Sequence, residues 1–341
     1  MGKRAYFVRM FFLGIMGIFL LGGCAGKDDT QREQELSRNE EGQGLVNIEQ
    51  TGGPEITPES LTEDTTKEPE EKEAEEEEPE KKEPEIKEAD WSGYFDGING
   101  AAVLYDAASM EYRVFNRELA ETRRSPCSTF KIISSLIALE NGIMDPEDSI
   151  RSWSGEIFWN EDWNRDLDFD KAFKASCVWY FREVTDEVGP ELMQEGIDQL
   201  LYGNRDISDW EGRENTNNNN RALTGFWIES SLLISPKEQT EVMGRIFGKD
   251  SVYSEKTQDE LKKVMLVEES GSDISIYGKT GMGKTEGVVV DAWYTGFAQK
   301  EGETIYFCVY LGRTDDKKVS SAGAKEIAIR LVEDYFNGLS R

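Results

Sequence analysis

The sequence predicts an α+β fold: an antiparallel sheet formed from N- and C-terminal strands, with a helical subdomain packed against it. Two observations support this prediction. β-rich runs lie near the beginning and near the end of the region 91–341, and the residues between them, 150–268, mostly follow a helical pattern. Strands at both ends of a helical insert imply one sheet built from the two ends of the chain.

The elements can be placed in chain order. Runs at 101–104 and 112–115, separated by a turn-like segment, predict an N-terminal hairpin. Pro126 then precedes a helical stretch over 128–140, which Asn141 and Gly142 close. Three later strands and a last amphipathic helix are predicted at 274–279, 287–297, 304–311 and 322–336.

Residues 1–23 have the pattern of an export signal. Three basic residues form a positive start, Met10–Leu21 is apolar, and small residues precede Cys24. This is typical of a bacterial lipoprotein signal with Cys24 as the lipid-bearing residue; the alternative is an ordinary signal peptide with a chance cysteine. The apolar run is shorter than the roughly 20 residues that span a membrane. We therefore expect an extracytoplasmic protein, lipid-anchored to the outer face of the cell membrane.

Residues 24–90 predict an acidic disordered spacer behind the lipidated cysteine. Within 27–90 there are 24 Asp and Glu against 8 Lys and Arg, with few apolar residues. Such a segment buries too little surface to offset its chain entropy, so it stays extended. The folded domain is then expected at 91–341, a length that allows one large core or two interlocked subdomains.

Charge and cysteine content exclude several classes of protein. The region 91–341 holds 44 Asp and Glu against 28 Lys and Arg, which argues against a nucleic-acid partner. Besides Cys24 the chain has Cys127, Cys177 and Cys308, an odd number that excludes a complete disulfide framework. Without histidine or a Cys-x-x-Cys pair, no metal site is expected. Small buried thiols are favoured, and a Cys127–Cys177 bridge stays open because each lies next to a candidate catalytic serine.

The tetrapeptide Ser128-Thr129-Phe130-Lys131 carries the main chemical signal. A serine hydroxyl needs a neighbouring base to act as a nucleophile, and the chain contains no histidine. Lys131 lies one helical turn after Ser128, among apolar residues whose burial would keep its amine neutral. The N-terminus of that helix also offers free N–H groups to a developing negative charge. The alternative is a helix-capping serine with a surface lysine.

Lys279-Thr280-Gly281 is the second chemical signal. It follows a β-rich run, and an edge strand that carries a lysine, a hydroxyl and a glycine can pair with an extended amide and hold a carboxylate. Taken alone, these three residues are explained better by a strand end that runs into a glycine turn.

Residues 278–285 also match the phosphate-loop pattern G-x-x-x-x-G-K-[ST]. That motif requires a helix after it, whereas Val288, Val289 and Val290 are typical of a strand. The sequence therefore argues against nucleotide binding, a conclusion that measurable affinity for Mg-ATP would reverse.

Taken together, the motifs resemble those of class D (oxacillinase-type) serine β-lactamases, which have the penicillin-recognising fold. The resemblance covers about residues 95–338. It rests on five ordered motifs: Ser128-Thr129-Phe130-Lys131, Ser176-Cys177-Val178, Tyr202-Gly203-Asn204, Phe226-Trp227-Ile228-Glu229 and Lys279-Thr280-Gly281. The lipoprotein signal and the acidic spacer suggest a Gram-positive branch, with 91–341 as the catalytic domain.

The resemblance implies a hydrolase of β-lactam antibiotics that works through a serine acyl-enzyme. Ser128 would attack the lactam carbonyl. Lys131, N-carboxylated by CO₂, would be the general base for acylation and again for the water that releases product. Ser176 would relay a proton towards the lactam nitrogen, although it could instead only cap the following helix. The implied partner is a small β-lactam, with no cofactor other than this CO₂ and no metal.

The resemblance also implies the surroundings of these groups. Val178 and Phe130 would wall a dry carbamate pocket, and Trp227 would donate its indole N–H there, although Trp227 could equally be a core residue. Backbone N–H groups of Ser128 and Met282 would form the oxyanion hole. The substrate would contact four consecutive residues: Lys279, Thr280, Gly281 and Met282.

Some features leave alternatives open. Family members usually grip the substrate carboxylate with an arginine near the C-terminus, and residues 318–325 contain none, so substrate preference stays open. Tyr202-Gly203-Asn204 could hold a turn. The alternative function is a β-lactam-binding sensor or penicillin-binding protein that acylates without fast turnover. Such sensors usually join several membrane helices to a zinc protease, for which this chain has no histidine. A catalytically dead, lipid-anchored binding module is a further alternative.

Overall fold

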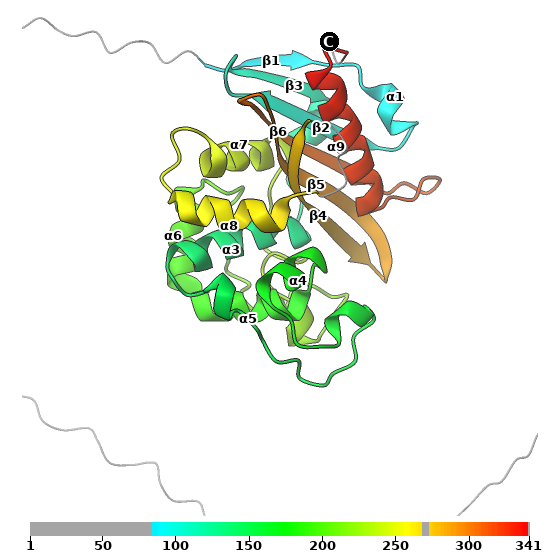
Figure 1. Cartoon of the computed structure of the whole chain (residues 1–341). Helices are drawn as coiled ribbons and strands as arrows, with labels where there is room; N and C mark the ends of the chain where they lie inside the picture. The colour runs from blue at the N-terminus through cyan, green and yellow to red at the C-terminus, as the bar shows by residue number, and fades with distance from the viewer. Residues whose placement is uncertain (1–82, 268–272, 340–341) are drawn as a thin grey trace, which may run out of the picture. The chain divides into compact units, whose positions relative to one another are not determined.

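The computed structural model describes residues 83–267 and 273–339 (Figure 1). Its sheet has the strand order β1-β3-β2-β6-β5-β4. The strands are β1 (Glu85–Glu88), β2 (Gly100–Asp106), β3 (Glu111–Phe115), β4 (Ser275–Thr285), β5 (Val288–Lys300) and β6 (Glu303–Gly312). The helices are α1 (Ser92–Phe95), α2 (Arg117–Ala120), α3 (Lys131–Glu140), α4 (Phe169–Lys174), α5 (Val178–Val188), α6 (Pro190–Gln199), α7 (Pro236–Phe247), α8 (Glu255–Met265) and α9 (Ser321–Phe336).

The predicted signal, Cys24 and most of the spacer lie outside the described residues, so the lipid anchor stays a prediction. Within the described ranges, no helix is both long enough and apolar enough to cross a membrane.

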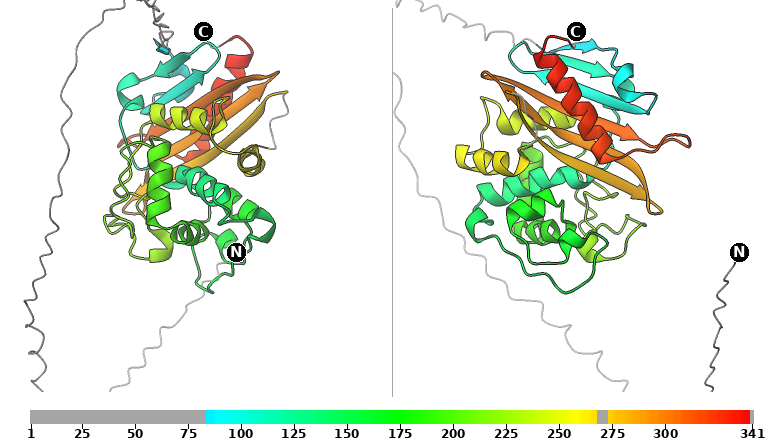
Figure 2. Two further views of the ribbon diagram at one scale, coloured as in Figure 1. Left: turned by 90° about the vertical axis from the view of Figure 1, so that its left-hand side faces the viewer. Right: turned by 45° about the vertical axis from the view of Figure 1, so that its right-hand side comes forward.

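The middle of the sheet joins the two ends of the described chain. β2 pairs antiparallel with β6, with Ala102 opposite Val309, and β6 pairs antiparallel with β5. Helices of the middle region cover one face of the sheet, while α9 lies across the other (Figure 2). The predicted sheet built from N- and C-terminal strands is therefore confirmed.

One strand was missed by the sequence analysis. β1 lies parallel to β3, with Glu85 opposite Glu111, and the Glu85 N–H donates to the Met110 carbonyl at 2.9 Å. The predicted spacer over 24–90 therefore ends too late, and the sheet is mixed rather than wholly antiparallel. An edge strand is paired on one side only, so most of its residues can be charged and exposed. In β1 only Ile86 packs against a buried cluster, and the charged residues around it do not form a recognisable strand pattern.

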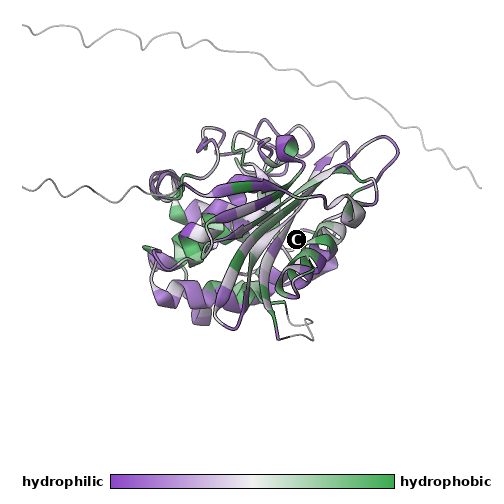
Figure 3. Ribbon diagram, turned by 90° about the horizontal axis from the view of Figure 1, so that it is seen from above, coloured by the Kyte–Doolittle hydropathy of each residue, from purple (hydrophilic) through white to green (hydrophobic). Residues whose placement is uncertain are grey.

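Alternate residues of the central strands contribute to two hydrophobic cores. In β5, Phe297 belongs to the core beneath the helical subdomain, and its neighbour Ala298 belongs to the core beneath α9. From α9, Ala324 and Leu331 are fully buried in that second core. Figure 3 shows the hydrophobic residues gathered along the strands, with polar residues on the outer sides of the helices.

The region 150–268 is less helical than its pattern predicts. It contains α4 to α8, but between α6 and α7 the chain forms a long irregular segment with one short 3-10 turn. Polar side chains hold this segment together: Asn204 Nδ2, for example, donates to the Ser231 carbonyl at 2.7 Å. α7 then begins at a capping box in which Ser235 and Glu238 each bond the other's backbone N–H.

β4 is longer than the predicted strand over 274–279 and includes all of residues 278–285. A turn and β5 follow it, so the helix that a phosphate loop requires is not formed by this segment. Gly278 is needed for packing instead, because a Cβ there would lie 2.5 Å from the Tyr294 ring. The glycines that complete the phosphate-loop pattern therefore belong to a strand.

Candidate active site

Ser128 lies at the beginning of a helical segment. A 3-10 turn over Cys127–Phe130 runs directly into α3, and Pro126 precedes it. Cys127 has φ +48°, a left-handed conformation that is uncommon for a residue with a side chain. The serine is half-buried and lines a cavity of about 340 Å³ between the helical subdomain and β4.

Lys131 is buried directly beside that hydroxyl. Its Nζ forms a hydrogen bond with Ser128 Oγ at 2.9 Å, and its side chain is 1% exposed. Burial lowers the pKa of Lys131 to about 8, because an ammonium is poorly solvated there. The predicted alternative of a surface lysine is therefore wrong. A neutral amine at this position can accept the hydroxyl proton over the same contact.

Ser176 and Lys279 form a second serine–lysine pair. Lys279 Nζ donates to Ser176 Oγ at 2.9 Å and to the Thr280 carbonyl at 3.0 Å. Burial, together with the charge of Lys131, holds the pKa of Lys279 well below its ordinary value. Ser176 lies between α4 and α5 with φ +54°. The N-cap of α5 is Cys177, which makes no side-chain capping bond, so Ser176 does not cap this helix.

β4 forms one wall of the cavity, which Thr280, Gly281 and Met282 line. Gly281 allows this close approach: a Cβ there would lie 2.9 Å from Thr129 Cγ2 and 3.0 Å from the Pro126 carbonyl oxygen. The structure thus brings Met282 and Ser128, the predicted oxyanion pair, to the same cavity.

The predicted carbamate-pocket residues divide into two groups. Val178, at the start of α5, lines the cavity. Phe130 and Trp227 are buried in the core, where their rings stack at 5.7 Å. Phe181 lies on another side of the amine, with its ring centre 5.5 Å from Lys131 Nζ. Phe181 is therefore an aromatic side chain in direct contact with the Lys131 amine.

Tyr202-Gly203-Asn204 holds a turn and does not line the cavity. Tyr202 is fully buried and packs edge-on against Phe130. Gly203 has φ +53°, and a Cβ there would lie 2.0 Å from the Leu233 carbonyl oxygen. Glycine is therefore required at this close approach, and the alternative of a turn is the one that the structure supports.

Several cavity residues were not identified from the sequence as site residues: Trp159, Asn217, Glu229 and Lys284. The Glu229 carboxylate accepts from the Lys284 backbone N–H and from Asn217 Nδ2, the latter at 2.7 Å. Burial raises the pKa of Glu229. The run of asparagines at 215–220 was the available signal, but by composition it indicated only a loop.

The cysteines that the structure describes are free thiols. Cys127, Cys177 and Cys308 are all buried and unpaired, so the suggested Cys127–Cys177 bridge is not formed. In the part of the chain that the structure describes, no group of three or more Cys, Asp or Glu side chains could hold a metal ion.

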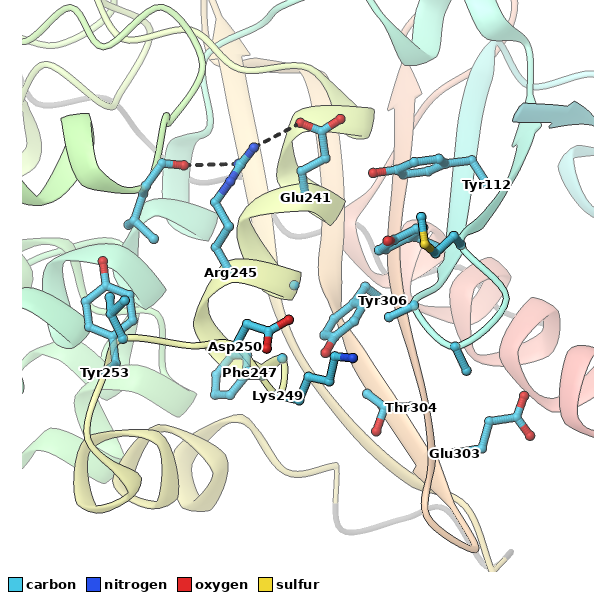
Figure 4. A pocket seen from close by; sticks show the side chains of 18 of the residues that line it. Tyr112, Glu241, Arg245, Phe247, Lys249, Asp250, Tyr253, Glu303, Thr304 and Tyr306 are labelled. Carbon is cyan, nitrogen blue, oxygen red and sulfur yellow. Dashed lines mark hydrogen bonds and ion pairs between the residues drawn. The ribbon is translucent and has the colours of Figure 1, made fainter. Parts of the chain in front are cut away.

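A larger cavity of about 1060 Å³ lies elsewhere, beside α7 and the β2–β3 turn (Figure 4). No serine or cysteine is among its lining residues, and Thr304 is its one lining hydroxyl that is not a phenol. Arg245 is already bonded to the Leu200 carbonyl at 3.1 Å and to Glu241 at 3.5 Å. The candidate catalytic side chains therefore lie at the smaller cavity.

Residues 85–333 match the family model of the penicillin-binding protein transpeptidase domain, and the chain belongs to this family. Two similar proteins indicate its class within the family. The chain is 30% identical over 241 residues to the probable β-lactamase YbxI of Bacillus subtilis, a match that covers 71% of this chain and 82% of that protein. The crystal structure of a class D β-lactamase from B. subtilis aligns with a TM-score of 0.62 at 29% identity, over 72% of this chain and 94% of the other. The protein is a member of the class D serine β-lactamase group.

A second kind of relative has the same domain. The regulatory protein BlaR1 of Bacillus licheniformis is 28% identical over 246 residues, which is 72% of this chain but 38% of BlaR1. The chain thus spans less than half of the length of that relative.

Proposed function

We propose that this protein hydrolyses β-lactam antibiotics through an acyl-enzyme on Ser128. The observation that carries the proposal is the contact between Ser128 Oγ and Lys131 Nζ, in which burial favours the neutral amine. Similarity to proteins named as β-lactamases supports the choice of substrate.

The proposed reaction begins when the base withdraws the Ser128 proton and the oxygen attacks the lactam carbonyl. The backbone N–H groups of Ser128 and Met282 stabilise the oxyanion, an effect worth about 10²–10³ in rate per donor. Ser176, held by Lys279, relays the proton from the base to the lactam nitrogen as the C–N bond breaks, which leaves the base free again. Thr280 and Lys279 orient the carboxylate of the substrate. Water then attacks the ester, and the same base accepts its proton.

We further propose that Lys131 acts as its N-carboxylated form. A neutral amine adds CO₂ with release of a proton, and the burial of Lys131 favours the neutral amine that this addition needs. Val178 and Phe130 would keep the carbamate dry, and the Trp227 indole would supply a donor. The carbamate is a proposal that follows from the family resemblance.

Added bicarbonate is expected to restore hydrolysis after dialysis at acidic pH, because a protonated carbamate loses CO₂. The measurement is the rate of hydrolysis of a chromogenic cephalosporin at increasing bicarbonate, before and after the acidic dialysis. An enzyme that shows no response at any pH uses an unmodified lysine.

A receptor that acylates and stays acylated is the second candidate, favoured by the similarity to BlaR1. Intact mass spectrometry of the full-length protein with benzylpenicillin over time separates the two functions. A transient adduct with continuing product formation supports the hydrolase, whereas a lasting stoichiometric adduct supports the receptor. Absence of both contradicts any penicillin-recognising function. The same spectra test the proposed anchor, because lipidation adds acyl mass at Cys24.

A further inference from the structure

We propose that Lys284 and Trp159 form a specificity subsite that favours β-lactams whose acyl side chain carries a carboxylate. The inference rests on the proposed function, since it needs a penicillin bound at Ser128. The subsite lies at the opposite end of the cavity from Thr280. The family resemblance assigns no role to Lys284 or to Trp159.

The strand geometry places Lys284 at that end. Alternate residues of a strand point to the same side, and Thr280, Met282 and Lys284 all line the cavity. The pairing of β4 with β5 has a register irregularity between Gly283 and Lys284, directly before this end of the wall. Four residues of strand span about 13 Å, so Thr280 and Lys284 mark two separate ends of one wall.

The chemistry of a penicillin matches this arrangement. Its ring carboxylate lies on the nitrogen side of the scissile bond, and its acylamino substituent lies on the carbonyl side. With the carbonyl between Ser128 and Met282 and the ring carboxylate at Thr280, the acyl side chain extends towards Lys284.

Lys284 offers an available positive charge. Its Nζ lies 4.5 Å from the centre of the Trp159 ring, and no ion pair joins it to a carboxylate of the described residues. It is also the one cation among the cavity-lining residues of the described chain. Trp159 is 66% exposed and packs on Trp163 at 5.1 Å, so its ring is open to a ligand. Together the two residues can bind an aromatic side chain and its attached carboxylate.

Two negative groups lie near this end of β4. Asp291 pairs with Gly283 in the sheet and accepts from the Tyr310 hydroxyl, and the hydrogen bonds of Glu229 are also made. The Glu229 carboxylate accepts from the Lys284 backbone N–H and from Asn217 Nδ2. Asn217 Oδ1 in turn accepts from the Glu286 N–H at 2.8 Å. The carboxylate thus joins the asparagine loop to the end of β4. The Lys284 charge acts on it from nearby, but among the described residues no hydrogen bond or ion pair fixes the ammonium to it.

The test compares benzylpenicillin with carbenicillin, which differ by one carboxylate on the acyl side chain. The second-order rate constant for acylation of the full-length protein is measured for both, because acylation is common to a hydrolase and a receptor. An exposed charge pair changes such a rate by about two- to fivefold. Lys284→Met is therefore expected to lower the carbenicillin-to-benzylpenicillin ratio by about that factor, and added salt is expected to lower it in the unaltered protein.

Two variants serve as controls. Lys284→Arg keeps the charge and is expected to keep the ratio. Lys237→Met removes a comparable lysine, whose Nζ lies 4.9 Å from the Tyr112 ring outside this cavity, and is expected to leave the ratio unchanged.

An unchanged ratio in Lys284→Met would overturn the subsite. An equal fall for both penicillins would also overturn it, because it would indicate a role in holding β4. Absence of acylation by either penicillin in the unaltered protein would instead overturn the proposed function and the inference with it.

Discussion

Ser128→Ala is expected to abolish both the penicillin adduct and hydrolysis. Without the hydroxyl there is no ester to form, and removal of a catalytic nucleophile of this kind costs on the order of 10⁶ in turnover. Intact mass spectrometry with benzylpenicillin measures the adduct, and a chromogenic cephalosporin measures the turnover.

Ser134→Ala is the matched control, since Ser134 is buried in α3 and its hydroxyl bonds only the Lys131 carbonyl, at 3.4 Å. It is expected to acylate normally. A Ser128→Ala protein that still forms a penicillin ester would show that another hydroxyl is the nucleophile, and Ser176 would be the first to test.

Lys131→Ala is expected to slow acylation by about 10²–10⁴, the usual contribution of a positioned general base. No histidine exists to replace it, and the other buried lysine of the described residues, Lys279, is bonded to Ser176 instead. Acylation is followed by stopped-flow or quenched mass spectrometry, and thermal unfolding checks that the variant is folded. Lys171→Ala, which removes an exposed lysine of α4, is expected to acylate at the normal rate.

The pH dependence identifies the form of the base. A free amine with a pKa of about 8 accepts a proton only when deprotonated, so its acylation rate would rise with pH through that value. At pH 7 about one molecule in ten would then be active. A carbamate base would remove this rise. Acylation by Lys131→Ala at an undiminished rate would show that neither form of this lysine is the base.

The sequence predicts those strands and helices whose residues show a pattern of apolar positions within the element itself. The strands around Val103 and Val309 have continuous apolar runs, and helix α3 has an apolar face and a clear end at Asn141. β1 could not be predicted in this way, because its stability comes from hydrogen bonds to β3, about 25 residues later in the chain, rather than from its own composition.

The same distinction between local pattern and long-range contact applies to the candidate site. Ser128, Lys131 and Lys279 lie in short motifs whose spacing has a chemical meaning, so they could be selected before their contacts were known. Trp159 and Lys284 carry no such pattern. Their contact joins segments 125 residues apart and depends on a β4 that continues past its predicted end, which only the folded chain reveals.

The pairing of β2 with β6 has a consequence for biosynthesis. A nascent chain emerges from the ribosome with Ser128 and Lys131 long before β4, β5 and β6 exist, so it holds the reactive groups without the opposite half of the proposed antibiotic-binding site. Reactivity towards a labelled penicillin then reports that synthesis has reached the last strand and that the two ends of the domain have met. Truncated or stalled molecules would not react with the labelled penicillin, even if their helices had formed.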